Sequence, residues 1–222
     1  EKGKDYPIYS RKYKSLNNKE EILIDVNKLA SKHTYYNIGS ISVSPNNRIL
    51  AYSFDNLSRR LYSIKFFDLK TKKHSKETIK NTTGSITWAN DNKTIFYNSK
   101  DLETLRSDRV MRYKVGESGT GEEVYFEDDE TFSVFSYKTK TDKYIVIGSS
   151  ATLSQEYRIL NADNPEGKFK IFQERVNGLE YSISHFKDKW YITTNKDGAT
   201  NFKLMNCPEN KTNSKNWKEY VP

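Results

Sequence analysis

The sequence contains a single cysteine, Cys207, among 222 residues, which excludes an internal disulfide bond. It has no run of about 18 apolar residues, so no membrane-spanning helix is expected. The first residues, Glu1 to Asp5, lack the apolar stretch of a secretory signal. We therefore expect a soluble chain with no membrane partner, and the sequence leaves its compartment open between cytoplasm and periplasm.

The motifs of common catalytic and cofactor sites are also missing. There is no Gly-x-Ser-x-Gly nucleophile elbow, and the nearest sequence, Gly116 to Gly119, has the wrong spacing. There is no cysteine pair, no His-x-x-x-His, no P-loop and no dinucleotide fingerprint. The three histidines, His33, His74 and His185, lie in separate units without a recurring Ser or Asp partner, so each is predicted to be structural or exposed. We predict no catalytic residue, no metal and no cofactor in this chain.

The formal net charge of +8 raises the question of nucleic-acid binding. The lysines are scattered through turns and alternate with apolar residues, as at Lys65, Lys114 and Lys203, which is typical of solvated faces. No nucleic-acid partner is expected. The acidic run 122–130 is predicted to be a solvated loop, with attraction of a basic ligand as the alternative.

The sequence repeats a short motif. Asn47 to Tyr52 (NRILAY) recurs as Asn92 to Tyr97 (NKTIFY), and more loosely at 142–147 and 188–193. The copies are spaced by about 45 to 50 residues, which is typical of β-propeller blades. A turn-forming polar residue followed by an apolar run predicts a turn that leads into a strand.

A second series of strand-like segments keeps the same period, at 61–68, 110–114, 157–161 and 202–206. Each unit has a further apolar run at either end, which gives four strands per unit. Aromatic residues make up 14% of the chain, in keeping with half-buried strands. The predicted fold is all-β, a β-propeller portion with about four complete four-stranded blades and half a blade. The predicted blades are 35–80, 81–128, 129–176 and 177–222.

Residues 1–34 are predicted to be the outer strands of a first blade. Glu20 to Lys32 is the best candidate for a helix in the sequence, and it fits equally well a strand that runs into a short turn of helix. The chain would then begin within a blade and be part of a longer protein. An open arc of blades leaves sheet faces uncovered, so self-association through exposed blade edges is expected.

Several longer stretches resemble the prolyl oligopeptidase family, and most closely oligopeptidase B (protease II). The resemblance covers essentially the whole chain, and its most specific stretches are Glu21 to Ala30, His33 to Tyr36, Asp55 to Ile64, Trp88 to Asp91 and Asn195 to Phe202.

The resemblance implies a serine peptidase with a seven-bladed propeller over an α/β-hydrolase domain that carries a Ser, Asp and His triad. It implies cleavage of short peptides after basic residues, and as partners it implies peptide substrates and the catalytic domain of the same parent chain. On this mapping the present chain is an open arc, from the latter half of blade one through blade five. The alternative is a free-standing propeller-like binding or scaffold module without enzymatic activity.

The longer connections of the repeat are expected on one face of the arc, and loops held by a rigid scaffold often carry function. They span 55–60, 99–109, 149–156 and 195–201. Among their residues, Arg59 and Arg60 are the first candidates for substrate or inter-domain contact, followed by Arg106 and Arg109. A guanidinium group can hold a carboxylate through two hydrogen bonds. The alternative is that these arginines form a surface pair or brace their own blade.

Overall fold

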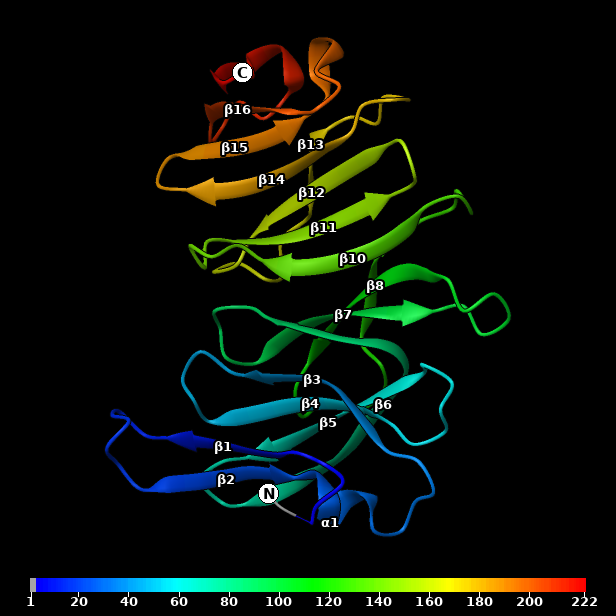
Figure 1. The fold of residues 1–222 in the computed structure, drawn as a ribbon, viewed down its shortest axis with the longest axis vertical. Helices are drawn as coiled ribbons and strands as arrows, with labels where there is room; N and C mark the ends of the chain where they lie inside the picture. The colour runs from blue at the N-terminus through cyan, green and yellow to red at the C-terminus, as the bar shows by residue number, and fades with distance from the viewer. Residues whose placement is uncertain (1–2) are drawn as a thin grey trace.

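The computed structural model describes residues 3–222, and β-strands account for 52% of the protein against 5% for helix. The strands form antiparallel sheets that follow one another along the long axis of the molecule, with the two chain ends at opposite ends of the stack (Figure 1). The prediction of an all-β propeller fold is confirmed. Within residues 3–222, no helix is long and apolar enough to cross a membrane.

The stack begins with a two-stranded sheet and a short helix. β1 (Ile8–Lys12) pairs with β2 (Glu20–Asp25), and α1 (Val26–Ala30) follows directly. The Asp25 side chain caps this helix, because its Oδ1 accepts a hydrogen bond of 3.1 Å from the backbone N–H of Asn27. The prediction of a strand that runs into a turn of helix is confirmed.

Four four-stranded meanders follow, and consecutive strands in each pair antiparallel. The first two share one strand and together comprise β3 (Asn37–Val43), β4 (Ile49–Asp55), β5 (Tyr62–Asp68), β6 (Lys73–Trp88), β7 (Thr94–Lys100), β8 (Ser107–Lys114) and β9 (Glu122–Phe126). The third comprises β10 (Ser133–Lys138), β11 (Tyr144–Ser150), β12 (Gln155–Asn161) and β13 (Lys170–Gln173). The fourth comprises β14 (Tyr181–Phe186), β15 (Lys189–Thr194), η1 (Lys196–Gly198), β16 (Lys203–Pro208), η2 (Ser214–Asn216) and β17 (Lys218–Val221).

The link between the first and second meanders has an extended backbone, so the last strand of one and the first strand of the next form a single strand, β6. Its first half pairs with β5 and its second half with β7. Between the halves, Asn81 and Gly84 adopt positive φ angles of 61° and 92°. A side chain at Gly84 would place its Cβ 2.9 Å from the Tyr62 ring, so glycine is required there for both conformation and space.

The repeated Asn or Asp has a backbone function. Asn47, Asn92 and Asp142 adopt left-handed φ angles of 58°, 64° and 57° in the turns between the first and second strands. Asn and Asp tolerate this conformation better than other residues with a side chain. In the fourth copy the left-handed residue is Lys187, with φ 55°, one position before Asp188. The repeat therefore marks the turn that sets the register of each meander.

The hydrophobic core lies between neighbouring sheets. Within residues 3–222, three clusters of buried side chains each combine residues from two successive meanders, and a fourth joins β2 and α1 to the first meander. Across the first boundary the cluster includes Ala51, Ile64, Phe66, Ile95, Tyr97 and Tyr113. Across the last it includes Val146, Phe172, Tyr181, Ile183, Trp190 and Met205. Burial of such side chains contributes roughly 1.5–3 kcal/mol each, so these boundaries hold the arc together.

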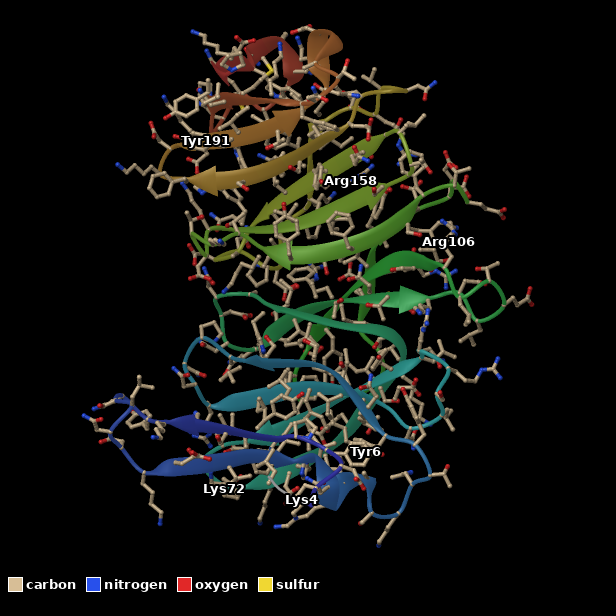
Figure 2. All side chains as sticks on the ribbon, viewed as in Figure 1. Lys4, Tyr6, Lys72, Arg106, Arg158 and Tyr191 are labelled. Atoms are coloured by element: carbon tan, nitrogen blue, oxygen red, sulfur yellow. The ribbon has the colours of Figure 1, made fainter. Side chains whose placement is uncertain are left out.

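The meanders present two different faces. Connections between first and second strands, and between third and fourth strands, emerge on one face, which we term the turn face. Connections between second and third strands, and the links between meanders, emerge on the other, which we term the loop face. Figure 2 shows Lys72 of the β5–β6 turn and Arg106 of the β7–β8 loop on opposite sides of the stack.

Candidate functional site

The loop between β4 and β5 presents Arg59 and Arg60 to solvent on the loop face. Buried Asp55 organises this loop, because its carboxylate accepts hydrogen bonds of 2.8 Å from the backbone N–H groups of Leu57 and Arg60. Arg60 itself adopts a left-handed φ of 55°. Within residues 3–222, neither arginine side chain forms an ion pair. The two guanidinium groups thus extend from a fixed loop and are available to a partner.

The Arg106 side chain forms hydrogen bonds within the chain. Its Nη1 donates hydrogen bonds to the backbone carbonyl oxygens of Glu127, Asp129 and Phe132, at 3.1, 3.1 and 2.9 Å. These carbonyls belong to the link between β9 and β10, so Arg106 braces the connection between two meanders. Its predicted contact with substrate or another domain stays a prediction, and these contacts favour the alternative, in which Arg106 braces the propeller.

The Arg109 side chain also bonds within the chain, at longer distances. Its Nη2 lies 3.2 Å from Asp108 Oδ2 and its Nε lies 3.6 Å from Glu123 Oε2. The guanidinium group stacks 5.1 Å from the centroid of the Phe126 ring. The four predicted arginines therefore divide into an exposed pair on the β4–β5 loop and two that bond within the chain, Arg106 in the β7–β8 loop and Arg109 in β8. Lys100 connects the two loops by donating a 3.0 Å hydrogen bond to the Arg60 carbonyl oxygen.

A buried charge network that was not predicted from the sequence lies beside these loops. Glu127, predicted to lie in a solvated loop, is only 4% exposed. Its Oε2 accepts hydrogen bonds from Arg175 Nη2 at 2.6 Å, from the Tyr125 hydroxyl at 2.7 Å and from the Ser149 hydroxyl. The backbone N–H of Arg175 donates to buried Glu156 at 3.1 Å. Arg175 Nη2 also lies 3.8 Å from Glu156 Oε1, so the Arg175 side chain joins two buried carboxylates.

The ionisation of Glu127 follows from these contacts. Burial alone would raise the pKa of its carboxyl group, but hydrogen bonds from Arg175, Ser149 and Tyr125 outweigh burial and hold the pKa below its usual value. The carboxylate is consequently charged at neutral pH. The repeat offered a signal for this pair, because Glu127 and Arg175 are 48 residues apart and both follow the fourth strand of their meander.

A cavity of about 500 Å³ opens beside this network. The Arg175 side chain and the β11–β12 loop form part of its wall. The lining residues are Asp129, Thr131, Phe132, Ala151, Thr152, Leu153, Ser154, Arg175 and Asn177. Such a wall can hold a polar chain by hydrogen bonds. It places no Ser, Thr or Cys beside a histidine, so it offers no activated nucleophile of the usual type.

The histidines adopt the structural and exposed roles predicted for them. His33 and His74 are exposed, whereas the His185 side chain is 1% exposed. His185 Nδ1 lies 2.7 Å from Thr141 Oγ1 and its Nε2 lies 2.8 Å from Glu209 Oε1. Burial lowers the pKa of this imidazole, although Glu209 opposes the shift. A neutral ring that donates to Glu209 and accepts from Thr141 satisfies both nitrogens and connects the third and fourth meanders.

The fold and the two-faced arrangement of loops are those of a propeller domain. A family model described as the prolyl oligopeptidase N-terminal β-propeller domain matches residues 1–222. The chain therefore belongs to the prolyl oligopeptidase family and represents its N-terminal propeller.

Individual relatives agree with this assignment. Dipeptidyl aminopeptidase BI of Pseudoxanthomonas mexicana is 37% identical over 99% of this chain and 32% of that protein. Protease 2 of Moraxella lacunata is 31% identical over 97% of this chain and 32% of that protein. The structure of oligopeptidase B from Leishmania major superposes with a TM-score of 0.90 at 28% identity, covering 98% of this chain and 31% of that one. The chain thus spans about a third of the length of these relatives.

Proposed function

We propose that residues 1–222 form the substrate-gating propeller of an oligopeptidase B-like serine endopeptidase that hydrolyses short peptides after basic residues. The match of the whole chain to the family's propeller carries this proposal, and the TM-score of 0.90 with oligopeptidase B supports it. The relatives are about three times as long as this chain, which supports a separate catalytic domain in the parent protein. In this proposal, the chain gates access and the parent's other domain performs the hydrolysis.

The inner strands supply a physical basis for gating. The first strands of three meanders line a cavity of about 490 Å³ with small and polar residues, including Gly39, Ser40, Ser42, Thr83, Ser85 and Thr87. A cavity of this volume has room for an extended peptide segment but not for a folded domain. The boundaries between sheets are packed with buried side chains, so the opening keeps its width.

The proposal predicts where activity resides. The longer protein that contains this propeller should hydrolyse arginyl and lysyl fluorogenic peptides and should be inactivated by a serine-directed phosphonate. Residues 1–222 alone should show neither turnover nor covalent labelling, because they lack a nucleophile elbow. Turnover or labelling of the isolated chain would contradict the proposal. A longer protein without a Gly-x-Ser-x-Gly segment would instead support a free-standing binding module.

A second activity has support from one relative. The protein that is 37% identical over nearly the whole chain is named a dipeptidyl aminopeptidase, which suggests removal of dipeptides from a free amino terminus. Substrates with blocked and free amino termini separate the two activities. An endopeptidase cleaves both, whereas a dipeptidyl aminopeptidase cleaves only the free form.

Arg59 and Arg60 are proposed to contact the peptide or the catalytic domain. Replacing both with alanine in the longer protein should lower kcat/KM by about tenfold, the loss expected of one charge-assisted hydrogen bond. The free energy of unfolding should stay within about 0.5 kcal/mol, because both side chains are exposed. The matched control is Lys211→Ala with Lys215→Ala, which removes two positive charges between β16 and β17 on the turn face. Equal effects in both double variants would mean that net charge alone is responsible.

A further inference from the structure

The positive charge of the chain is concentrated at its N-terminal end. Residues 1–80 contain 17 of the 37 Lys and Arg residues but only 8 of the 29 Asp and Glu residues, giving a formal charge of +9. Residues 81–222 carry a formal charge of −1. The excess charge therefore belongs to the two-stranded sheet and the first meander, and such asymmetry indicates an anionic partner.

Two hairpins bring this charge together on the turn face. The β1–β2 hairpin projects from the lower left of the molecule in Figure 1, and Lys72 of the β5–β6 turn lies beside it in Figure 2. Glu21 joins the hairpins, because its carboxylate accepts a 2.8 Å hydrogen bond from Arg11 Nε and another from Lys72 Nζ. We term the exposed lysines of these two turns the basic hairpin patch: Lys12, Lys14, Lys19, Lys70, Lys72 and Lys73. Across residues 3–222, Lys72 is the one member that forms an ion pair.

The patch has an apolar tip. Leu16 is 84% exposed, the highest value among the large apolar side chains of residues 3–222, and Tyr13 is 58% exposed. Lys12 Nζ fixes the turn by donating a 2.8 Å hydrogen bond to the Leu16 carbonyl oxygen, and Lys14 Nζ lies 5.4 Å from the Tyr13 ring centroid. The hairpin thus presents two apolar side chains framed by lysines.

Three kinds of anionic partner could cover this patch: a second copy of the chain, nucleic acid, or a lipid surface. A second copy of the chain would have to offer its acidic run 122–130, but within that run Glu122, Glu123 and Asp129 already pair with arginines of the same chain. Nucleic acid would neutralise the lysines through its phosphates but would leave the exposed Leu16 without an apolar contact.

We propose that the basic hairpin patch binds an anionic lipid surface. The lysines lie at the headgroups, while Leu16 and Tyr13 enter the boundary between headgroups and acyl chains. The absence of long apolar runs predicted no membrane partner, but this patch forms from turns that are distant in the sequence. The patch lies on the turn face, so binding leaves Arg59 and Arg60 on the loop face accessible.

Vesicle sedimentation tests this proposal with the protein that carries residues 1–222. It should bind vesicles made of equimolar phosphatidylcholine and phosphatidylserine, and not vesicles of phosphatidylcholine alone. The double variant Lys14→Asn with Lys19→Asn should bind about 25-fold more weakly, since each lysine near such a surface contributes about fivefold. Asparagine is chosen because residue 14 has a left-handed φ of 63°. Leu16→Ser should weaken the binding that persists at high salt.

The matched control is Lys187→Asn with Lys189→Asn, which removes two exposed lysines from the β14–β15 turn on the same face. This control should bind as the unmodified protein does. Equal loss in both double variants, or equal binding to neutral vesicles, would overturn the proposal. Binding to transfer RNA without binding to vesicles would also overturn it and would assign the patch to nucleic acid.

Discussion

Replacing Arg175 with methionine is expected to lower the free energy of unfolding by about 3–5 kcal/mol. Arg175 Nη2 lies 2.6 Å from Glu127 and 3.8 Å from Glu156, and each carboxylate side chain is 5% exposed. Methionine can keep the contact with the Phe132 ring, whose centroid lies 3.6 Å from the guanidinium carbon. It leaves buried Glu127 without its cation, whereas Glu156 keeps a 2.5 Å ion pair with Arg158. Urea unfolding followed by tryptophan fluorescence measures the loss.

The pH dependence of this loss provides a more specific test. Because the pKa of Glu127 is lowered in the folded protein, its contribution to stability is present above the usual value of 4.5 and is lost as the pH falls through the lower folded value. Without Arg175, burial dominates and the pKa of Glu127 should rise. The difference in stability between variant and unmodified protein should therefore be large at neutral pH, begin to shrink as the pH falls through the raised pKa of the variant, and keep shrinking until the pH is below the lowered pKa of the unmodified protein.

The matched control for this experiment is Arg59→Met, which replaces an exposed arginine by the same residue. It should change stability by less than about 0.5 kcal/mol at every pH. A loss in the Arg175 variant that stays constant between neutral and acidic pH would show that side-chain packing, and not the buried charge, accounts for the effect.

The fold was predictable because its strongest signals are local. The repeated residues at 47, 92 and 142 occupy left-handed turn positions, and a turn residue followed by an apolar run defines a hairpin within a few residues. The short helix after β2 was predictable for the same reason, since Asp25 caps it from the adjacent position. Residues close in sequence determine these features.

The charge network was not predictable from local patterns. Glu127 lies in an acidic run that reads as solvated, and its burial depends on Arg175, which is 48 residues away. Arg106 was predicted to contact a partner, but its three carbonyl acceptors are supplied by the next inter-sheet link. His185 shows the same dependence, because Thr141 belongs to the neighbouring meander. Contacts across a boundary between sheets require the packing to be known.

Replacing Trp190 with alanine is expected to reduce stability by about 3–5 kcal/mol, the range for removal of a buried aromatic side chain. Trp190 is fully buried, and its ring lies 5.0 Å from Tyr144, 5.2 Å from Phe172 and 4.8 Å from His185, centroid to centroid. Tyr144 and Phe172 belong to the third meander and Trp190 to the fourth. The cavity would therefore open at the boundary between these two sheets.

The position of the cavity predicts which part of the Trp190→Ala variant should unfold first. Loosening this boundary should expose the link 174–180 to limited proteolysis before the other links, because the remaining inter-sheet clusters stay intact. Trp190→Phe should lose less stability than Trp190→Ala, since a ring still fills most of the space. Phenylalanine also removes the indole Nε1, a buried donor without a hydrogen-bond partner in residues 3–222. Uniform cleavage at all links in the alanine variant would show that the sheets unfold together, so that the arc depends on every boundary at once.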